Sequence, residues 1–219
     1  QVEFELSDKD ARAAKNPLLV RCGANHTAVL CGNLKPSMRL NAELSAEENF
    51  LWTFGNGWHG RLGLGDTKSQ FLPKRVKMRP VRDISLGFDH TAAITARDEL
   101  YVWGKGTLLG EVVNVLTPKR FTSVEGTSQF KSVLCGENET FVIDSMGRLH
   151  SWGSNNCGQL GLGQLHGQFV TTPTLVKAIH EPVSSIISGG SFTIAHLENG
   201  DLLAWGSQSC GRLGLVEPK

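Results

Sequence analysis

Two histidines are the residues that most suggest chemistry, because they recur at one position of a repeated phrase. His26 and His90 both stand fourth in G-x-x-H-T, and two histidines at equivalent positions suggest a pair of metal ligands or an acid–base pair. The same position of two later phrases holds Glu139 and Phe192, and a phenylalanine cannot bind a metal. We therefore interpret the histidines as strand residues that hydrogen-bond to a neighbouring repeat, and we expect no metal site. A threonine follows in every phrase: Thr27, Thr91, Thr140 and Thr193. Its hydroxyl would satisfy a nearby backbone group.

A glycine pattern at residues 55–60, G-N-G-W-H-G, has the form of a dinucleotide-binding loop. Such a loop needs a helix N-terminus after the glycines to bind the pyrophosphate. Here RLGLGDTKSQFLP follows instead, which is rich in helix-breaking residues. The related G-R/Q-L-G-L runs also lack the Lys-Ser/Thr ending of a phosphate loop. We interpret these glycines as turn residues and expect no cofactor.

Composition excludes several other classes of function. No set of Ser, His and Asp recurs in a way that would place a nucleophile beside a base, so we expect no catalytic residues and no enzyme. With 22 basic and 21 acidic residues the net charge is +1, which favours neither nucleic acid nor an anionic membrane as partner. No stretch approaches the roughly 18 apolar residues of a membrane helix. QVEFELSDKD is no secretory signal, so we expect an intracellular protein of the cytoplasm or nucleus.

The elements that position these residues are set by an internal repeat. Four of the five tryptophans are separated by 51, 49 and 53 residues. Each follows apolar residues and is followed by a glycine, directly or after two positions: Trp52, Trp103, Trp152 and Trp205. A glycine opens a similar phrase 16 residues before the last three of them, but Gly23 lies 29 residues before Trp52. The first unit therefore contains 13 extra residues. One structural unit used four times explains this register.

Within each unit the pattern is that of strands. TAAIT, the turn Arg97–Glu99 and LYVW read as a hairpin, and a short apolar run before each glycine supplies an innermost strand. A proline begins the stretch we expect to form the outer strand, as it can do without losing a ladder hydrogen bond. Four strands in roughly 50 residues are typical of a propeller blade. The fold class predicted is all-β, with propeller blades of four antiparallel strands.

The combination of G-x-x-H-T-A-A, L-x-V-W-G, G-R/Q-L-G-L-G and a following proline resembles the repeat of the regulator-of-chromosome-condensation family, over about residues 17–215. The resemblance implies a seven-bladed propeller, of which this chain holds about four blades, so we expect a fragment or an incomplete ring. We place the repeats at about residues 17–80, 81–130, 131–182 and 183–219. Residues 1–16 form a separate segment, either a tail or a clasp in which Val2, Phe4 and Leu6 supply the missing last strand.

Interruptions of the repeat are the candidate binding sites, because insertions in repeat proteins form loops on one face. The extra residues of the first unit, within 33–49, expose an apolar and basic triplet, Met38, Arg39 and Leu40. A neutral insertion is the alternative. Trp58 and His59 are a second irregularity, and Trp58 is either an interface anchor or packed against the next blade. The turn after Trp103, KGTLLGE, is shortened, so we expect it to pack between blades in a different way from the other turns.

Two functions follow from these observations. The first is a protein-interaction scaffold, part of a larger assembly. The second, implied by the resemblance, is a guanine-nucleotide exchange factor for a Ran-like small GTPase. In that case Asp89, in GFDH, matches an acidic residue of the family's G-x-x-H turns. The family's chromatin contacts use a basic tail, whereas QVEFELSDKD is acidic. We therefore expect a protein partner, no direct contact with nucleic acid and no membrane.

Overall fold

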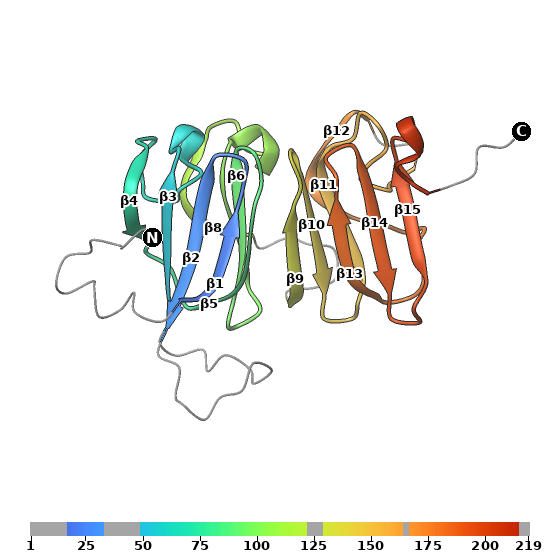
Figure 1. Cartoon of the computed structure of the whole chain (residues 1–219), viewed down its shortest axis with the longest axis horizontal. Helices are drawn as coiled ribbons and strands as arrows, with labels where there is room; N and C mark the ends of the chain where they lie inside the picture. Colours follow the sequence, from blue (N-terminus) through green and yellow to red (C-terminus); the bar gives the residue numbers. More distant parts are fainter. Residues whose placement is uncertain (1–16, 33–48, 122–128, 164–166, 215–219) are drawn as a thin grey trace, which may run out of the picture.

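The computed structural model describes residues 17–32, 49–121, 129–163 and 167–214 of the chain, which form four antiparallel sheets (Figure 1). The first sheet contains β1 (Pro17–Cys22), β2 (His26–Gly32), β3 (Asn49–Gly55) and β4 (Gln70–Arg75). The second contains β5 (Val81–Leu86), β6 (His90–Thr95), β7 (Leu100–Gly104) and β8 (Val115–Arg120). The third contains β9 (Phe130–Cys135), β10 (Glu139–Asp144), β11 (Leu149–Ser154) and β12 (Phe169–Leu175). The fourth contains β13 (Val183–Ser188), β14 (Phe192–Leu197) and β15 (Leu202–Gly206).

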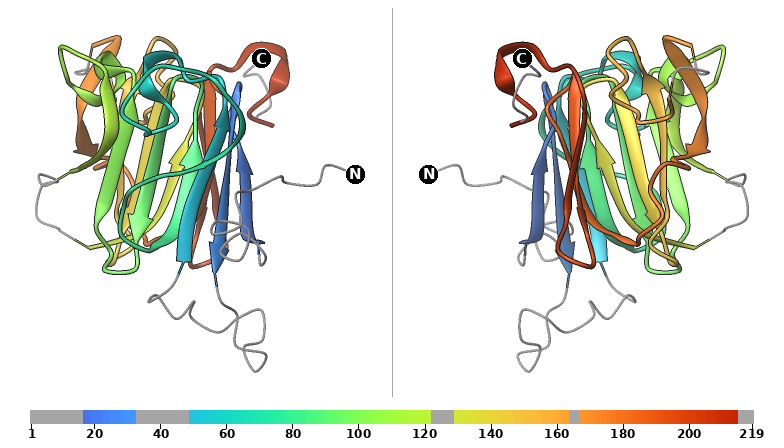
Figure 2. Two further views of the ribbon diagram at one scale, coloured as in Figure 1. Left: turned by 90° about the vertical axis from the view of Figure 1, so that its left-hand side faces the viewer. Right: turned by 90° about the vertical axis from the view of Figure 1, so that its right-hand side faces the viewer.

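The four sheets are consecutive blades of a β-propeller, as the repeat predicted. The first strands of neighbouring blades, such as β5 and β9, contact each other, whereas β4, β8 and β12 lie at the outer rim. Three 3-10 turns, η1 (Trp58–Gly60), η2 (Gly106–Leu109) and η3 (Ser209–Gly211), lie at the same end of the blades, drawn uppermost in Figures 1 and 2. We call this the upper end. The fourth blade has three strands among the described residues.

The hydrophobic core lies between the blades. Successive side chains of a strand point to opposite faces, so a middle blade buries both of its faces. Ile84 of the second blade packs with Leu30 and Leu51 of the first. Val102 of the second blade packs with Val142 of the third. The uninterrupted burial of β6 and β10 follows from this stacking. No helix among the described residues is long and apolar enough to cross a membrane.

One register assignment made from the sequence is wrong. In the later blades the threonine of G-x-x-H-T pairs with the repeated tryptophan, as Thr91 pairs with Trp103. In the first blade, however, Thr27 pairs with Phe54, and Trp52 lies two residues earlier, opposite Val29. Phe54 directly precedes a glycine, as the other tryptophans do, so a phenylalanine fills the tryptophan position. The insertion is therefore 15 residues long rather than 13.

The prolines of the outer strands are also placed differently from the prediction. Pro73, Pro118 and Pro173 lie inside β4, β8 and β12 rather than at their first residue. Each lies where the pairing with the preceding strand shifts register. A bulge at the rim tolerates a missing N–H, which is why the strand can continue through the proline.

Polar contacts between blades explain the repeated histidines and threonines. His26 Nε2 lies 2.8 Å from the hydroxyl of Thr91 in the next blade, and His90 Nε2 lies 2.8 Å from that of Thr140. The Thr91 hydroxyl donates in turn to the carbonyl oxygen of Arg61, at 2.9 Å. The interpretation of the histidines as contacts between repeats is confirmed.

The indole N–H groups of two tryptophans are satisfied in the same way. Trp103 Nε1 donates to the carbonyl oxygen of Arg61 at 2.9 Å, and Trp205 Nε1 donates to that of Gln159 at 2.8 Å. Both acceptors belong to the G-R/Q-L-G-L turn of the preceding blade. The shortened turn after Trp103 supplies no such acceptor, and the buried Trp152 Nε1 has no hydrogen-bond partner among the described residues. Instead, Phe121 stacks on Trp152 with ring centroids 6.0 Å apart, so the packing at this turn differs from that at the other turns.

This difference between the tryptophans predicts different costs of mutation. Trp103→Phe should lower the free energy of unfolding by about 1 kcal/mol more than Trp152→Phe, because only the first removes a buried hydrogen bond. Urea denaturation of both variants and the wild type measures the difference. Equal losses, or a larger loss for Trp152→Phe, would contradict the assignment of the indole hydrogen bond.

Candidate partner-binding surface

A buried ion pair organises the upper end of the first two blades. Arg61 follows η1 and is only 1% exposed. Its Nη2 is paired with the carboxylate of Asp89, from the G-x-x-H loop of the second blade. The same guanidinium donates to the carbonyl oxygens of Phe88 and Trp58, each at 3.0 Å. Arg61 therefore fixes two turns that lie 28 residues apart in the sequence.

Basic side chains lie on several sides of the Asp89 carboxylate. Besides Arg61, the Asp89 carboxylate has Nε2 of His59 at 3.8 Å and Nζ of Lys105 at 3.9 Å. Burial lowers the pKa of Arg61, while the charge and hydrogen bond of Asp89 act in the opposite direction. A carboxylate paired in this way with a buried guanidinium is a structural anchor more than a free carboxylate offered to a ligand.

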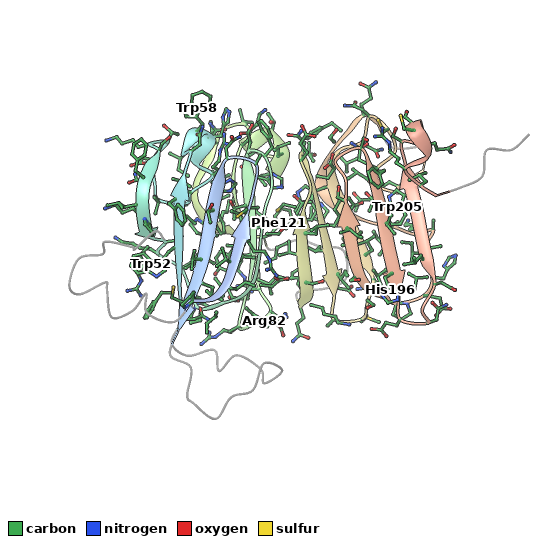
Figure 3. The ribbon with its side chains drawn as sticks, viewed as in Figure 1. Trp52, Trp58, Arg82, Phe121, His196 and Trp205 are labelled. Carbon is green, nitrogen blue, oxygen red and sulfur yellow. The ribbon has the colours of Figure 1, made fainter. Side chains whose placement is uncertain are left out.

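Exposed apolar side chains lie on the turns that this anchor joins and on a loop linked to them by a hydrogen bond. Trp58 is 65% exposed and projects from the upper end (Figure 3). Val112 is fully exposed, Val113 is 71% exposed, and the amide of Asn114 donates to His59 Nδ1 at 3.4 Å. The hydrogen bond between Asn114 and His59 therefore joins the turn that carries Trp58 to the loop that carries the two valines. We call Trp58, His59, Phe88, Asp89, Lys105, Val112 and Val113 the upper-end cluster.

Trp58 owes its exposure to the local backbone. His59 adopts φ of 58°, in the left-handed region, and Gly60 follows with φ of 79°. The Asn56 side chain accepts the backbone N–H of Trp58 at 2.8 Å, which fixes the start of the turn. The second of the two alternatives for Trp58, packing against the next blade, is therefore not the arrangement observed.

The structure brings together three of the six residues singled out from the sequence. Trp58, His59 and Asp89 lie in one cluster, whereas Met38, Arg39 and Leu40 fall outside the described residues, as does the clasp expected in residues 1–16. The sequence analysis missed Arg61 and Lys105. Arg61 could have been noticed as the variable position of G-R/Q-L-G-L, but nothing local indicates that it reaches Asp89.

The other kinds of site to consider within the described ranges are a metal site and a pocket that could hold a ligand. No group of three His, Cys, Asp or Glu side chains there could hold a metal ion. A pocket of about 170 Å³ lies at the rim of the second blade. It is lined by Val102, Leu109, Glu111, Val115, Lys119, Arg120 and Phe121. Its size admits one side chain, and its charged residues Lys119 and Arg120 are paired with Glu111 and Glu99.

Comparison with known proteins agrees with the propeller. The regulator of chromosome condensation (RCC1) repeat matches residues 48–94 and 146–196, and a second form of the same repeat matches residues 81–108. Together these matches cover just over half of the chain.

Curated relatives are similar over much of the chain. The ultraviolet-B receptor UVR8 of Arabidopsis thaliana is 32% identical, over 77% of this chain and 39% of its own length. The mitochondrial RCC1 domain-containing protein RUG3 of the same plant is 30% identical, over 96% of this chain and 47% of its own length. The chain thus spans less than half the length of these relatives.

Solved structures share the fold. Prp20p of Saccharomyces cerevisiae superposes with a TM-score of 0.75 at 21% identity, covering 100% of this chain and 50% of its own. Human WBSCR16 gives a TM-score of 0.72 at 23% identity, covering 90% of this chain and 49% of its own. The repeat matches, the blade structure and these likenesses together show that the chain belongs to the regulator of chromosome condensation (RCC1) repeat family.

Proposed function

We propose that this chain acts as a protein-interaction scaffold and that a partner protein binds the upper-end cluster. The observation that carries the proposal is Trp58, a large aromatic side chain 65% exposed on a turn held rigid by Arg61. Exposed tryptophans on rigid turns are typical anchors of protein interfaces, because they bury much area at little cost in conformational entropy. Prp20p is a relative with binding properties toward Gsp1p and histones, which is in keeping with a protein partner.

The scaffold proposal predicts that Trp58→Ala removes a partner. We expect the proteins retained by the wild-type chain from a lysate of its source to be lost with this variant, because the anchor supplies about 2 kcal/mol or more of binding free energy. Quantitative mass spectrometry of the retained proteins measures the loss. Met146→Ala is the matched control, since Met146 is 67% exposed but lies in the turn between β10 and β11, at the other end of the blades. An unchanged set with Trp58→Ala would remove the cluster from consideration.

Exchange of guanine nucleotide is the second candidate, and Asp89 bears on it. The carboxylate that the family resemblance would assign to the exchange face is already engaged by Arg61, His59 and Lys105. We therefore rank exchange below the scaffold. A Ran-like GTPase loaded with fluorescent nucleotide should release it no faster with this chain than without it. Acceleration by orders of magnitude, abolished by Lys105→Ala, would reverse the ranking.

The cellular location stays a prediction. The sequence analysis favours the cytoplasm or nucleus, whereas the relative RUG3 is mitochondrial. Fluorescence microscopy of the natural full-length protein carrying a C-terminal tag tests this directly.

A further inference from the structure

The rim strand of the first blade has an unusual run of basic residues. Between Asp66 and Asp83 the sequence contains no acidic residue. The same stretch, which includes β4, contains six basic residues: Lys68, Lys74, Arg75, Lys77, Arg79 and Arg82. In Figure 1, β4 is the outermost strand of its blade, and no strand pairs with its outer edge among the described residues.

Three of these six cations make no ion pair or ring contact within the described part of the chain. Arg79 pairs with Glu99 at 3.1 Å, Arg82 pairs with Asp98 at 2.7 Å, and the Arg75 guanidinium lies 3.8 Å from the centroid of the Phe50 ring. The other three, Lys68, Lys74 and Lys77, are exposed and make no ion pair within the described part of the chain. Among the described residues, Lys74 on β4, Lys68 before it and Lys77 after it therefore present unpaired positive charge to solvent.

An aromatic side chain lies among these lysines. Phe71 is 97% exposed and Leu72 is 50% exposed, and both belong to β4. Lysine and proline on an edge strand serve by themselves to discourage the addition of another strand. An exposed phenylalanine works against that protection, so protection alone does not account for β4.

The other rim strands lack this combination. In β8 the two cations are neutralised, because Lys119 pairs with Glu111 and Arg120 pairs with Glu99 at 3.2 Å. In the third blade Lys177, which follows β12, is the equivalent of Lys77, since both come directly after a buried valine. The stretch 167–177 contains no other basic residue. Of the three rim strands that the structure describes, only that of the first blade has this feature.

We infer that the outer edge of β4 binds an extended acidic segment of another protein that carries a large apolar side chain. Lys68, Lys74 and Lys77 attract its carboxylates, Phe71 contacts its apolar side chain, and its backbone pairs with the open edge of β4. A polypeptide is favoured because an added strand pairs with both the N–H and the C=O groups of an open edge in one ladder. This rim surface is separate from the upper-end cluster.

The test uses the whole chain and a fluorescein-labelled peptide rich in Asp and Glu with one central Phe. We expect saturable binding by fluorescence anisotropy that weakens as salt rises. Phe71→Ala and the double variant Lys74→Glu/Lys77→Glu should each raise Kd about tenfold. Lys177→Glu, the equivalent change in the third blade, should leave Kd unchanged. All these positions lie at the surface, and circular dichroism of each variant verifies that it is folded.

Several outcomes would overturn the inference. One is no binding of the peptide by the wild-type chain; another is binding that Phe71→Ala and the lysine variant leave intact. Tighter binding of phosphatidylserine vesicles or single-stranded RNA than of the peptide, lost with the lysine variant, would assign β4 to those ligands instead. Peptide binding lost with Trp58→Ala but kept with Phe71→Ala would place the peptide on the upper-end cluster. That result would leave the proposed function standing while this inference fails.

Discussion

Replacing Arg61 by alanine is expected to lower the free energy of unfolding by about 3–5 kcal/mol, because it leaves a buried carboxylate without its counter-charge. Asp89 is only 6% exposed, and the other two basic nitrogens near it, His59 Nε2 and Lys105 Nζ, lie at 3.8 Å and 3.9 Å, beyond hydrogen-bonding distance. The variant also frees the carbonyl oxygens of Phe88 and Trp58. Urea denaturation followed by tryptophan fluorescence measures the loss.

A double-variant cycle separates the ion pair from simple loss of packing. Asp89→Ala should also destabilise the protein, since it leaves the Arg61 guanidinium buried without an anion. The double variant should then cost less than the sum of the two single variants, by about 1–3 kcal/mol. Lys105→Ala is the control, because its side chain is 38% exposed and its loss should cost less than about 1 kcal/mol. Additive losses from Arg61→Ala and Asp89→Ala would show that the two side chains do not act as a pair.

Residue spacing was sufficient to predict the blades. Trp103, Trp152 and Trp205 recur with the period of the repeat, and the structure places each on the third strand of its blade. The error at Phe54 arose because Trp52 was aligned with the other tryptophans by residue type, and not by its position within the repeat. Trp or Phe can occupy the strand position opposite the repeated threonine, so the position relative to Gly55 was the better guide.

The candidate site was only partly predictable, for a different physical reason. Trp58 and His59 could be recognised from the sequence because they interrupt the repeat. Asp89 could be recognised because it lies within the repeated G-x-x-H phrase. The link from Arg61 to Asp89 arises when two blades stack and two turns come together. The turn lengths and blade twist that produce this contact are properties of the assembled propeller. The sequence around Lys105, Val112 or Val113 does not predict which residues lie near them in the folded chain.

Buried histidines between the blades should make stability depend on pH. Burial lowers the pKa of His90 to about 4, although the backbone of Glu139 and the charge of Asp89 act in the opposite direction. Burial, with the charges of Arg61 and His90, lowers the pKa of His26 to about 3. In the unfolded chain both histidines titrate near 6.5. Below that pH the unfolded state binds more protons than the native state, so stability falls as the pH drops from about 6.5 to about 4.

Replacing His90 by glutamine should remove its share of this dependence. Each pKa unit corresponds to about 1.4 kcal/mol, so His90 should account for about 2–4 kcal/mol of the stability lost over this range. Glutamine keeps an N–H near Thr140 but has no proton to gain. Urea denaturation at a series of pH values should therefore show a flatter profile for His90→Gln than for the wild type. His196→Gln is the matched control, because His196 is exposed on β14 (Figure 3) and should leave the profile unchanged. A wild-type profile retained by His90→Gln would show that His90 is not the group whose protonation opens the interface between the second and third blades.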